Sequence, residues 1–288
     1  MNERLYRAAE ERLWQSHGVT PREHRLHLSA NAVTVRVQEV GEGPPVLFIH
    51  GANTSGASWA ALASRLRGFR CLILDRPGTG LSEPLPQELN AERVARFADT
   101  LVADVLDALG IDTAHLVATS YGGYIALRSA AAHPDRVQRM VQFSWPVGAP
   151  TDWLPSFMRL MAVPGVGRLI AALPASERSV RMTFRRIGHG ASLDAGRITR
   201  EDLECYLALL RYTDTMRNEL APARVFVSPV HGLRRMLLPD DLMARIESPI
   251  HFVWGENDPF GGPATGRALL NSLPNATLEV LPAAGHAP

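Results

Sequence analysis

Residues 116–127 read LVATSYGGYIAL, a short apolar run followed by a turn of small residues and then by a segment that favours a helix. Ser120 stands at the apex of that turn. The first N–H groups of a helix lack intrahelical partners, so a hydroxyl placed there lies beside donors that stabilise negative charge. We therefore interpret Ser120 as a candidate nucleophile, and the plainer alternative is a helix N-cap without chemistry. The turn departs from the pattern G-x-S-x-G at Ala118, a change that is tolerated if that position does not need a positive φ.

Apolar strands and helical segments alternate on both sides of this turn. The strands are predicted at 24–28, 33–40, 45–49, 71–75, 115–118, 137–143, 250–254 and 276–281, and the helices near 58–66, 91–109, 122–132 and 263–273. The first two strands read as a hairpin, and the uninterrupted apolar runs among the others indicate burial on both faces, as in a parallel sheet. The sequence thus predicts an α/β fold with a doubly wound, mostly parallel sheet.

The alternation is interrupted after Trp145 by a long helical segment that proline repeatedly breaks. We interpret it as a helical cap inserted before the penultimate strand. The predicted division is an N-terminal helical extension (1–22), a core (23–145 and 242–288) and the cap (146–241). Most large apolar residues of the cap should pack as core, and a subset should line an apolar pocket. The large apolar residues in question are Trp153, Phe157, Met158, Met161, Met182, Phe184, Met216, Phe226, Met236 and Met243.

Composition excludes several classes of protein. The chain has 288 residues, 30 basic against 29 acidic, and a net charge of +1, so no overall charge favours nucleic acid or an acidic membrane. All of the basic residues are arginine. The absence of lysine excludes a lysine Schiff base, a P-loop lysine and a Ser–Lys dyad. The bias toward arginine, alanine and proline is typical of a GC-rich bacterial genome.

Neither the cysteines nor the N-terminus indicates export. Cys71 lies in an apolar run and reads as a core residue, and a disulfide with Cys205 is not expected. The first residues form a charged amphipathic pattern without the apolar stretch of a signal peptide, and no run reaches the 18 apolar residues of a membrane span. A cytoplasmic location is the expectation.

Residues able to carry out acyl transfer follow four of the predicted strands. They are Ser120, Asp258, His286 and the pair His50-Gly51. The carboxyl ends of parallel strands converge on one edge of an open sheet, where ligands bind. These four loops are therefore expected to meet, although they lie far apart in the sequence.

The order Ser120, Asp258, His286, with His50-Gly51 upstream and a helical insertion before the acid, resembles the α/β-hydrolase fold. Residues 75–82, DRPGTGLS, are similar to the D-x-x-G-x-G-x-S turn of that family. The resemblance covers the chain from about residue 24 to His286 and leaves the first twenty or so residues outside it.

The resemblance implies a serine hydrolase with a defined site. Ser120 attacks a carbonyl carbon after His286 takes its proton, and Asp258 orients the imidazole. The backbone N–H groups of Ala52 and Tyr121 form the oxyanion hole. Asp258 is favoured over Glu256 as the acid.

The same resemblance implies supporting roles for other residues. His50 and the turn at 75–82 are structural, and Asn53 and Trp145 face the site and contact substrate. No metal and no organic cofactor are expected. Family members normally continue into a helix after the histidine, whereas only two residues follow His286 here. The expectation is a weakly ordered histidine near a frayed terminus.

The leading function is hydrolysis of a carboxylic ester in a small apolar substrate. Other chemistry on the same scaffold stays open, namely carbon–carbon hydrolysis, perhydrolysis or hydroxynitrile cleavage. A non-catalytic small-molecule binding protein is a third reading, because fold alone does not decide function. A serine at the turn argues against haloalkane and epoxide hydrolases, which need a carboxylate nucleophile. The oligomeric state is not predicted.

Overall fold

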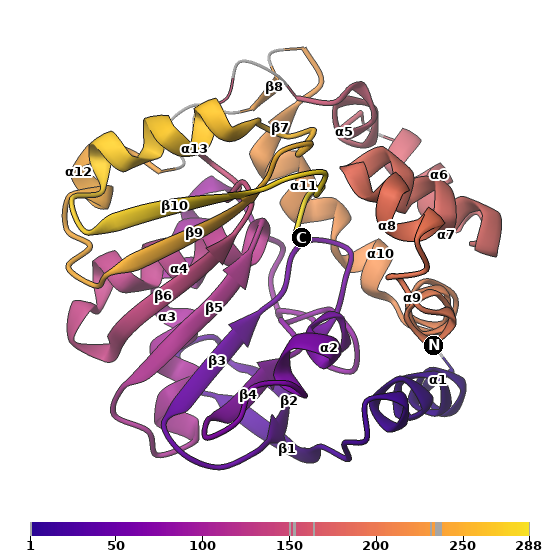
Figure 1. The fold of residues 1–288 in the computed structure, drawn as a ribbon, viewed down its shortest axis with the longest axis horizontal. Coiled ribbons are helices and arrows are strands. Elements are labelled where there is room, and N and C mark those ends of the chain that lie inside the picture. Colours follow the sequence, from indigo (N-terminus) through magenta and orange to yellow (C-terminus); the bar gives the residue numbers. More distant parts are fainter. Residues whose placement is uncertain are drawn as a thin grey trace.

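An eight-stranded sheet forms the centre of the computed structural model, which describes residues 2–149, 151, 154–163, 165–230, 232–233 and 238–287. Its order is β1-β2-β4-β3-β5-β6-β9-β10 (Figure 1). The strands are β1 Arg22–Leu28, β2 Val33–Val40, β3 Pro45–Ile49, β4 Arg70–Leu74, β5 Ala114–Thr119, β6 Val137–Phe143, β9 Ile250–Gly255 and β10 Ala276–Leu281. β1 pairs with β2 and β2 with β4 in antiparallel register, and every other pair in this sheet is parallel. The predicted fold class is confirmed.

Helices cover both faces of the sheet because its central strands are apolar on both sides. Side chains 47–49 of β3 have no exposed surface, and alternate ones belong to two different cores. One core contains α3 Ala91–Ala108 and α4 Tyr121–Ala132. The other contains α1 Glu3–Ser16, the 3-10 turn Gly56–Trp59 and α2 Ala60–Ala63. The helix predicted at 58–66 is thus shorter and begins as a 3-10 turn.

The cap is the helical segment between β6 and β9, and it lies beside the carboxyl ends of the strands (Figure 1). It contains α5 Ser156–Met161, α6 Val166–Ala172, α7 Glu177–Phe184, a π-helical turn Arg185–His189, α8 Gly190–Asp194, α9 Arg200–Tyr212, α10 Thr215–Asn218 and α11 Leu220–Phe226. It ends with a two-stranded ribbon that the sequence did not predict, β7 Val227–Ser228 with β8 Gly232–Leu233. α12 Asp240–Met243 leads back to the sheet, and α13 Pro263–Leu269 joins β9 to β10.

α1 links the cap to the core. It packs along α9, and the Asn2 backbone N–H donates to the Tyr212 carbonyl at 2.7 Å. Apolar positions of α1 such as Leu13 and Trp14 are buried, which explains why a charged N-terminal segment is helical and ordered.

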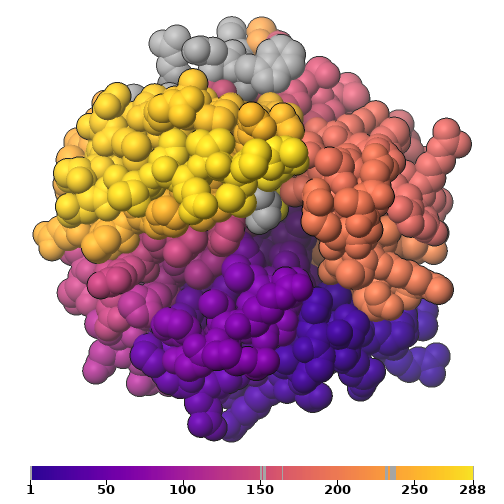
Figure 2. Space-filling view, viewed as in Figure 1, coloured from indigo at the N-terminus to yellow at the C-terminus, as the bar shows by residue number. Residues whose placement is uncertain are grey.

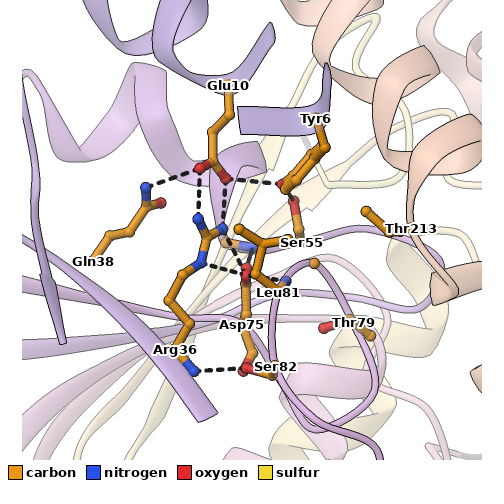
Figure 3. Close-up of polar contacts among 12 residues, drawn as sticks. Tyr6, Glu10, Arg36, Gln38, Ser55, Asp75, Thr79, Leu81, Ser82 and Thr213 are labelled. Atoms are coloured by element: carbon orange, nitrogen blue, oxygen red, sulfur yellow. Dashed lines mark hydrogen bonds and ion pairs between the residues drawn. The ribbon is translucent and has the colours of Figure 1, made fainter. Parts of the chain in front are cut away.

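A buried ion-pair network fixes the inner face of α1 (Figure 3). Both carboxylate oxygens of Glu10 accept from the Arg36 guanidinium at 2.6 Å, and Asp75 accepts from Arg36 Nε at 2.8 Å. Tyr6 and Ser55 share a further hydrogen bond of 2.9 Å. Glu10, Arg36 and Asp75 are all nearly inaccessible to solvent. The network therefore ties α1, β2 and the turn after β4 together.

Cys71 and Cys205 are both buried and free. Over the part of the chain that the structure describes, no helix has the length and apolar character needed to span a membrane.

Candidate active site

The turn at Ser120 is a sharp change from strand to helix. β5 ends at Thr119, α4 begins at Tyr121, and Ser120 between them has φ 53° and ψ −116°. A positive φ is uncommon for a residue with a side chain and stores backbone strain. Ala118 lies buried within β5 and is not among the residues with positive φ, so its methyl group is accommodated without strain. A Cβ at Gly122 would lie 2.1 Å from the Ile49 carbonyl oxygen, so glycine is required there.

Asp258 and His286 form a buried hydrogen-bonded pair. His286 Nδ1 lies 2.9 Å from Asp258 Oδ2, and the carboxylate also accepts from the backbone N–H groups of Trp145 at 3.2 Å and Phe260 at 2.9 Å. Because an ionised carboxylate only accepts, Nδ1 carries a proton, and in the neutral ring Nε2 is then the nitrogen with the lone pair. Glu256, the alternative acid, is exposed and accepts from the backbone N–H of Ala283.

The cap holds the loop that carries His286. The backbone N–H of His286 donates to the Ile187 carbonyl at 2.8 Å, and its carbonyl accepts from His189 Nε2 at 2.6 Å. Ser144 Oγ accepts from the Ala287 backbone N–H at 2.8 Å. His286 is 8% exposed, so the weak ordering expected near the chain end is not what the structure shows. Burial lowers the pKa of His189, which favours the neutral ring in this contact.

The loop after β3 and the start of α4 each supply one unpaired backbone donor. Among the described residues, neither the N–H of Ala52 nor that of Tyr121 donates to a protein acceptor. Ala52 is exposed toward the same cavity as Ser120, and Tyr121 directly follows the serine. Free N–H groups at a cavity wall are the kind of donor that an oxyanion needs.

A buried carboxylate from the cap holds that loop in place. Glu219, at the junction of α10 and α11, accepts from both terminal nitrogens of the Arg76 guanidinium at 3.1 Å. It also accepts from the Asn53 backbone N–H at 3.2 Å. Arg76 in turn donates to the carbonyls of His50 at 3.0 Å and Gly51 at 2.9 Å. The Arg76–Glu219 pair thus joins the cap to the residues on both sides of Ala52.

His50 is a structural residue, and its contacts require the neutral ring. Nδ1 lies 2.8 Å from the Gly51 carbonyl, so it carries the proton, while Nε2 accepts from the Arg76 backbone N–H at 3.1 Å. Protonation of Nε2 would place its N–H against the Arg76 N–H and break this hydrogen bond. Burial, followed by the charge of Arg76, lowers the pKa of His50 well below 6.5.

This histidine predicts a loss of stability in acid. Below its unfolded pKa of 6.5 the unfolded chain binds a proton that the folded chain does not, so the contribution is complete above that pH and declines below it. The free energy of unfolding should fall by up to about 1.4 kcal/mol per pH unit on this account. Urea unfolding at pH 7.5 and 5.5 measures the slope. The variant His50→Asn should be less stable at pH 7.5 but show a shallower slope, and equal slopes would contradict the assignment.

Six of the seven predicted site residues line one cavity of about 1070 Å³, and the seventh, Asp258, lies behind His286. The cavity lining includes Ser120, His286, Ala52, Tyr121, Asn53 and Trp145. The cavity lies between the cap and the loops that follow the strands of the core, and Figure 2 shows the orange cap beside the yellow C-terminal part of that core. Trp145 is nearly inaccessible, its indole N–H donates to the Ala149 carbonyl at 3.1 Å, and its ring stacks on Phe260. The indole N–H of Trp145 is therefore already satisfied within the protein.

The structure also selects which cap residues line this cavity. They are Phe157, Met158, Met161, Phe184 and Phe226 from the predicted set. Met243 is buried in the core and Met182 points into solvent, whereas Trp153 and Met236 lie outside the described residues. No group of three or more metal-ligating side chains occurs in the described ranges.

Comparisons with known proteins agree with this architecture. The family model for the alpha/beta hydrolase fold matches residues 44–160. A pimeloyl-[acyl-carrier protein] methyl ester esterase of Chromobacterium violaceum is 30% identical over 264 residues, which cover 88% of this chain and 91% of the relative. A 2-hydroxy-6-oxononadienedioate/2-hydroxy-6-oxononatrienedioate hydrolase of Burkholderia vietnamiensis is 28% identical over 269 residues, which cover 88% of this chain and 84% of the relative. The crystal structure of a Bacillus subtilis carboxylesterase has a TM-score of 0.72 at 20% identity over 99% of this chain and 92% of that one.

The chain therefore belongs to the α/β-hydrolase fold family, and the relatives named above are hydrolases.

Sequence reasoning missed the contacts that the cap makes with this site. Arg76 lies in the quoted turn at 75–82, but its partner Glu219 is one acidic residue among many and follows no motif. His189 is flanked by glycine on both sides and belongs to no motif, yet it contacts the His286 loop. A buried partner more than ninety residues away leaves no local pattern to read.

Proposed function

We propose that this protein is a serine hydrolase that cleaves a carboxylic ester of a small, largely apolar substrate. Ser120 is the nucleophile, His286 the general base and Asp258 the residue that orients the imidazole. The observation that carries the proposal is the buried Asp258–His286 pair opening into the same cavity as the strained serine turn. Perturbed backbone geometry at a hydroxyl in a pocket is typical of a functional site.

The proposed chemistry follows from these positions. His286 Nε2 accepts the Ser120 proton as the oxygen bonds to the ester carbonyl carbon, and the N–H groups of Ala52 and Tyr121 bind the resulting oxyanion. The alcohol leaves with the proton that His286 returns. Water, deprotonated by the same nitrogen, then hydrolyses the acyl-serine and releases the carboxylic acid.

The lining of the cavity favours an apolar ester. Its described cationic residues are Arg65 and Arg197, and both lie at exposed positions. Around Ser120 the walls are aromatic and aliphatic, including Trp59, Phe157 and Phe226. A pocket of this composition excludes water and strengthens the hydrogen bonds to the oxyanion. Asn53 and Trp145 are proposed to contact the substrate.

Carbon–carbon hydrolysis is the second candidate, because several relatives are named 2-hydroxy-6-oxo dienoate or dioate hydrolases. A dicarboxylate substrate would need unpaired buried cations in the cavity, whereas the lining residues Arg65 and Arg197 are exposed and the buried Arg76 is paired with Glu219. This contrast favours the ester. Comparing hydrolysis of p-nitrophenyl butyrate with that of a 2-hydroxy-6-oxo dicarboxylate under the same conditions separates the two substrates.

A fluorophosphonate probe tests the nucleophile directly. Incubation should attach one phosphonyl group, and mass spectrometry of the digested protein should place it on Ser120, because a base-activated serine attacks phosphorus as it attacks a carbonyl. A matched control is Ser58, a serine that lines the same cavity away from the turn and should stay unlabelled. A pocket that binds apolar esters without any labelling would indicate a binding protein instead.

We also propose the domain division predicted from the sequence, with 1–22 as a helical extension, 23–145 and 242–288 as the core and 146–241 as the cap. In its support, β6 ends at Phe143 and α12 begins at Asp240, so the whole inserted segment lies between them.

A further inference from the structure

The net charge of +1 conceals a strongly basic segment in the cap. Residues 155–190 carry six arginines and one glutamate, a net charge of +5, and the arginines are Arg159, Arg168, Arg178, Arg181, Arg185 and Arg186. Two of them have carboxylate partners, since Arg181 pairs with Glu177 and Arg185 with Asp194. Within the described ranges, Arg168, Arg178 and Arg186 form no ion pair. Most of this charge is therefore exposed and uncompensated.

The same part of the cap exposes large apolar side chains. Among the described residues six large hydrophobic side chains are exposed, and five of them belong to the cap: Leu160 at 50%, Leu169 at 66%, Leu173 at 63%, Met182 at 45% and Val230 at 70%. The Arg159 guanidinium donates to the carbonyls of Pro229 at 3.0 Å and Val230 at 2.8 Å, which joins Val230 to α5. Figure 1 places α5, α6 and α7 together along one outer edge of the molecule.

The exposed leucines are not needed for the cavity. α5 and α7 turn their other faces inward, where Phe157 and Phe184 line it. A helix of a globular protein usually presents polar residues to water on its outer face. Exposed leucines interleaved with arginines are instead typical of helices that lie in a membrane interface.

We propose that the outer side of α5, α6, α7 and the π-helical turn after α7, here called the basic cap face, docks on an anionic lipid surface. It consists of Leu160, Leu169, Leu173 and Met182 with the six arginines. The arginines would contact lipid phosphates while the leucines enter the boundary of the acyl chains. A second copy of the chain is a poorer occupant, because pairing two such faces would bring together two segments of charge +5. A nucleic acid would leave the leucines in water.

The docking proposal stands apart from the chemistry proposed at Ser120. None of the residues that form the basic cap face is part of the cavity lining, although lining residues such as Met158, Met161 and Phe184 adjoin them in sequence. Docking would place the cavity wall formed by α5 and α7 next to the lipid, where apolar esters concentrate. Loss of lipid binding and loss of esterase activity are therefore separable measurements.

Sedimentation with vesicles tests the proposal. The 288-residue protein should bind vesicles of phosphatidylcholine and phosphatidylglycerol at 3:1, should bind pure phosphatidylcholine at least tenfold less, and should be released as NaCl rises from 0.05 to 0.5 M. The triple variant Arg168→Gln, Arg178→Gln, Arg186→Gln should lower the partition coefficient by about 100-fold, at roughly fivefold per charge. The variant Leu169→Asp, Leu173→Asp should lower it at least about tenfold.

Matched controls carry equal changes elsewhere on the surface. The triple variant Arg67→Gln, Arg245→Gln, Arg267→Gln removes three exposed charges from the core, and Leu5→Asp alters the exposed leucine of α1. Both should change binding less than threefold. Hydrolysis of p-nitrophenyl butyrate in the absence of vesicles should be unchanged in every variant. Absence of binding to the anionic vesicles, equal losses in the core variants, or a dimer that the Leu169→Asp, Leu173→Asp variant dissociates would each overturn the proposal.

Discussion

Replacing Ser120 by alanine should reduce ester hydrolysis by roughly four to six orders of magnitude in kcat. Alanine has no hydroxyl group and cannot form the acyl intermediate. Only the oxyanion donors and substrate binding remain, and these typically accelerate the reaction about 10³–10⁴-fold over water. KM should change little because Ser120 contributes few of the contacts in the cavity. Initial rates with p-nitrophenyl acetate and butyrate measure the loss. The variant must be purified free of wild-type enzyme, because a trace of it would mask so large a decrease.

The matched control for this variant is Ser58→Ala. Ser58 lines the same cavity, but its hydroxyl donates to the Ser55 carbonyl at 2.9 Å and stands away from the turn. Its rates should stay within about twofold of wild type, as expected for a residue that makes no transition-state contact. Retention of more than a tenth of wild-type kcat by Ser120→Ala would exclude Ser120 as the nucleophile. Melting curves of both variants check that the fold is intact, since alanine tolerates the φ of 53° about as well as serine.

Replacing Arg36 by methionine should cost about 3–5 kcal/mol in the free energy of unfolding. The change leaves the Glu10 and Asp75 carboxylates buried without their cation, and an uncompensated buried charge is far more costly than a lost exposed pair. Methionine fills a similar space, so the loss reports the charge rather than a cavity. Urea unfolding followed by circular dichroism measures it.

An exposed pair of the same chemistry serves as the control for Arg36→Met. Arg96 and Glu92 form an i,i+4 pair on α3 with side chains 74% and 79% exposed. The variant Arg96→Met should lose at most about 0.5 kcal/mol. Adding Glu10→Gln to Arg36→Met should restore part of the loss, because it removes one of the two stranded charges. A loss below about 1 kcal/mol in Arg36→Met would show that the network contributes little to stability.

Most of the fold could be predicted because its strands leave a strong local pattern. The run from Val46 to Ile49 is apolar without interruption, and the structure buries it on both faces between two helical layers. The cap was harder to predict because its elements are short and proline interrupts them. The β7–β8 ribbon has only two residues in each strand, too few for any period to appear.

The candidate site also has a part that the sequence predicts and a part that it does not. Ser120, Asp258 and His286 each follow a strand, so topology alone predicts that they meet. The sequence could not predict how each one is held. His286 seemed unsupported near the end of the chain, yet its backbone is bonded on both sides to residues 187 and 189 of the cap. Such support depends on tertiary packing between segments nearly one hundred residues apart.

The Arg76–Glu219 pair has a consequence for how this protein would select its substrates. If the cap swings away from the core, Glu219 leaves with it, and the Arg76 guanidinium and the Asn53 N–H lose their acceptor. The contacts of Ile187 and His189 with the histidine loop would break in the same movement. Under the proposed mechanism, reactivity would therefore depend on closure of the cap. An ester that is too bulky for the cap to close over it would occupy the cavity and inhibit the protein. The groups around Ala52 and His286 would then not reach the positions that the proposed reaction requires.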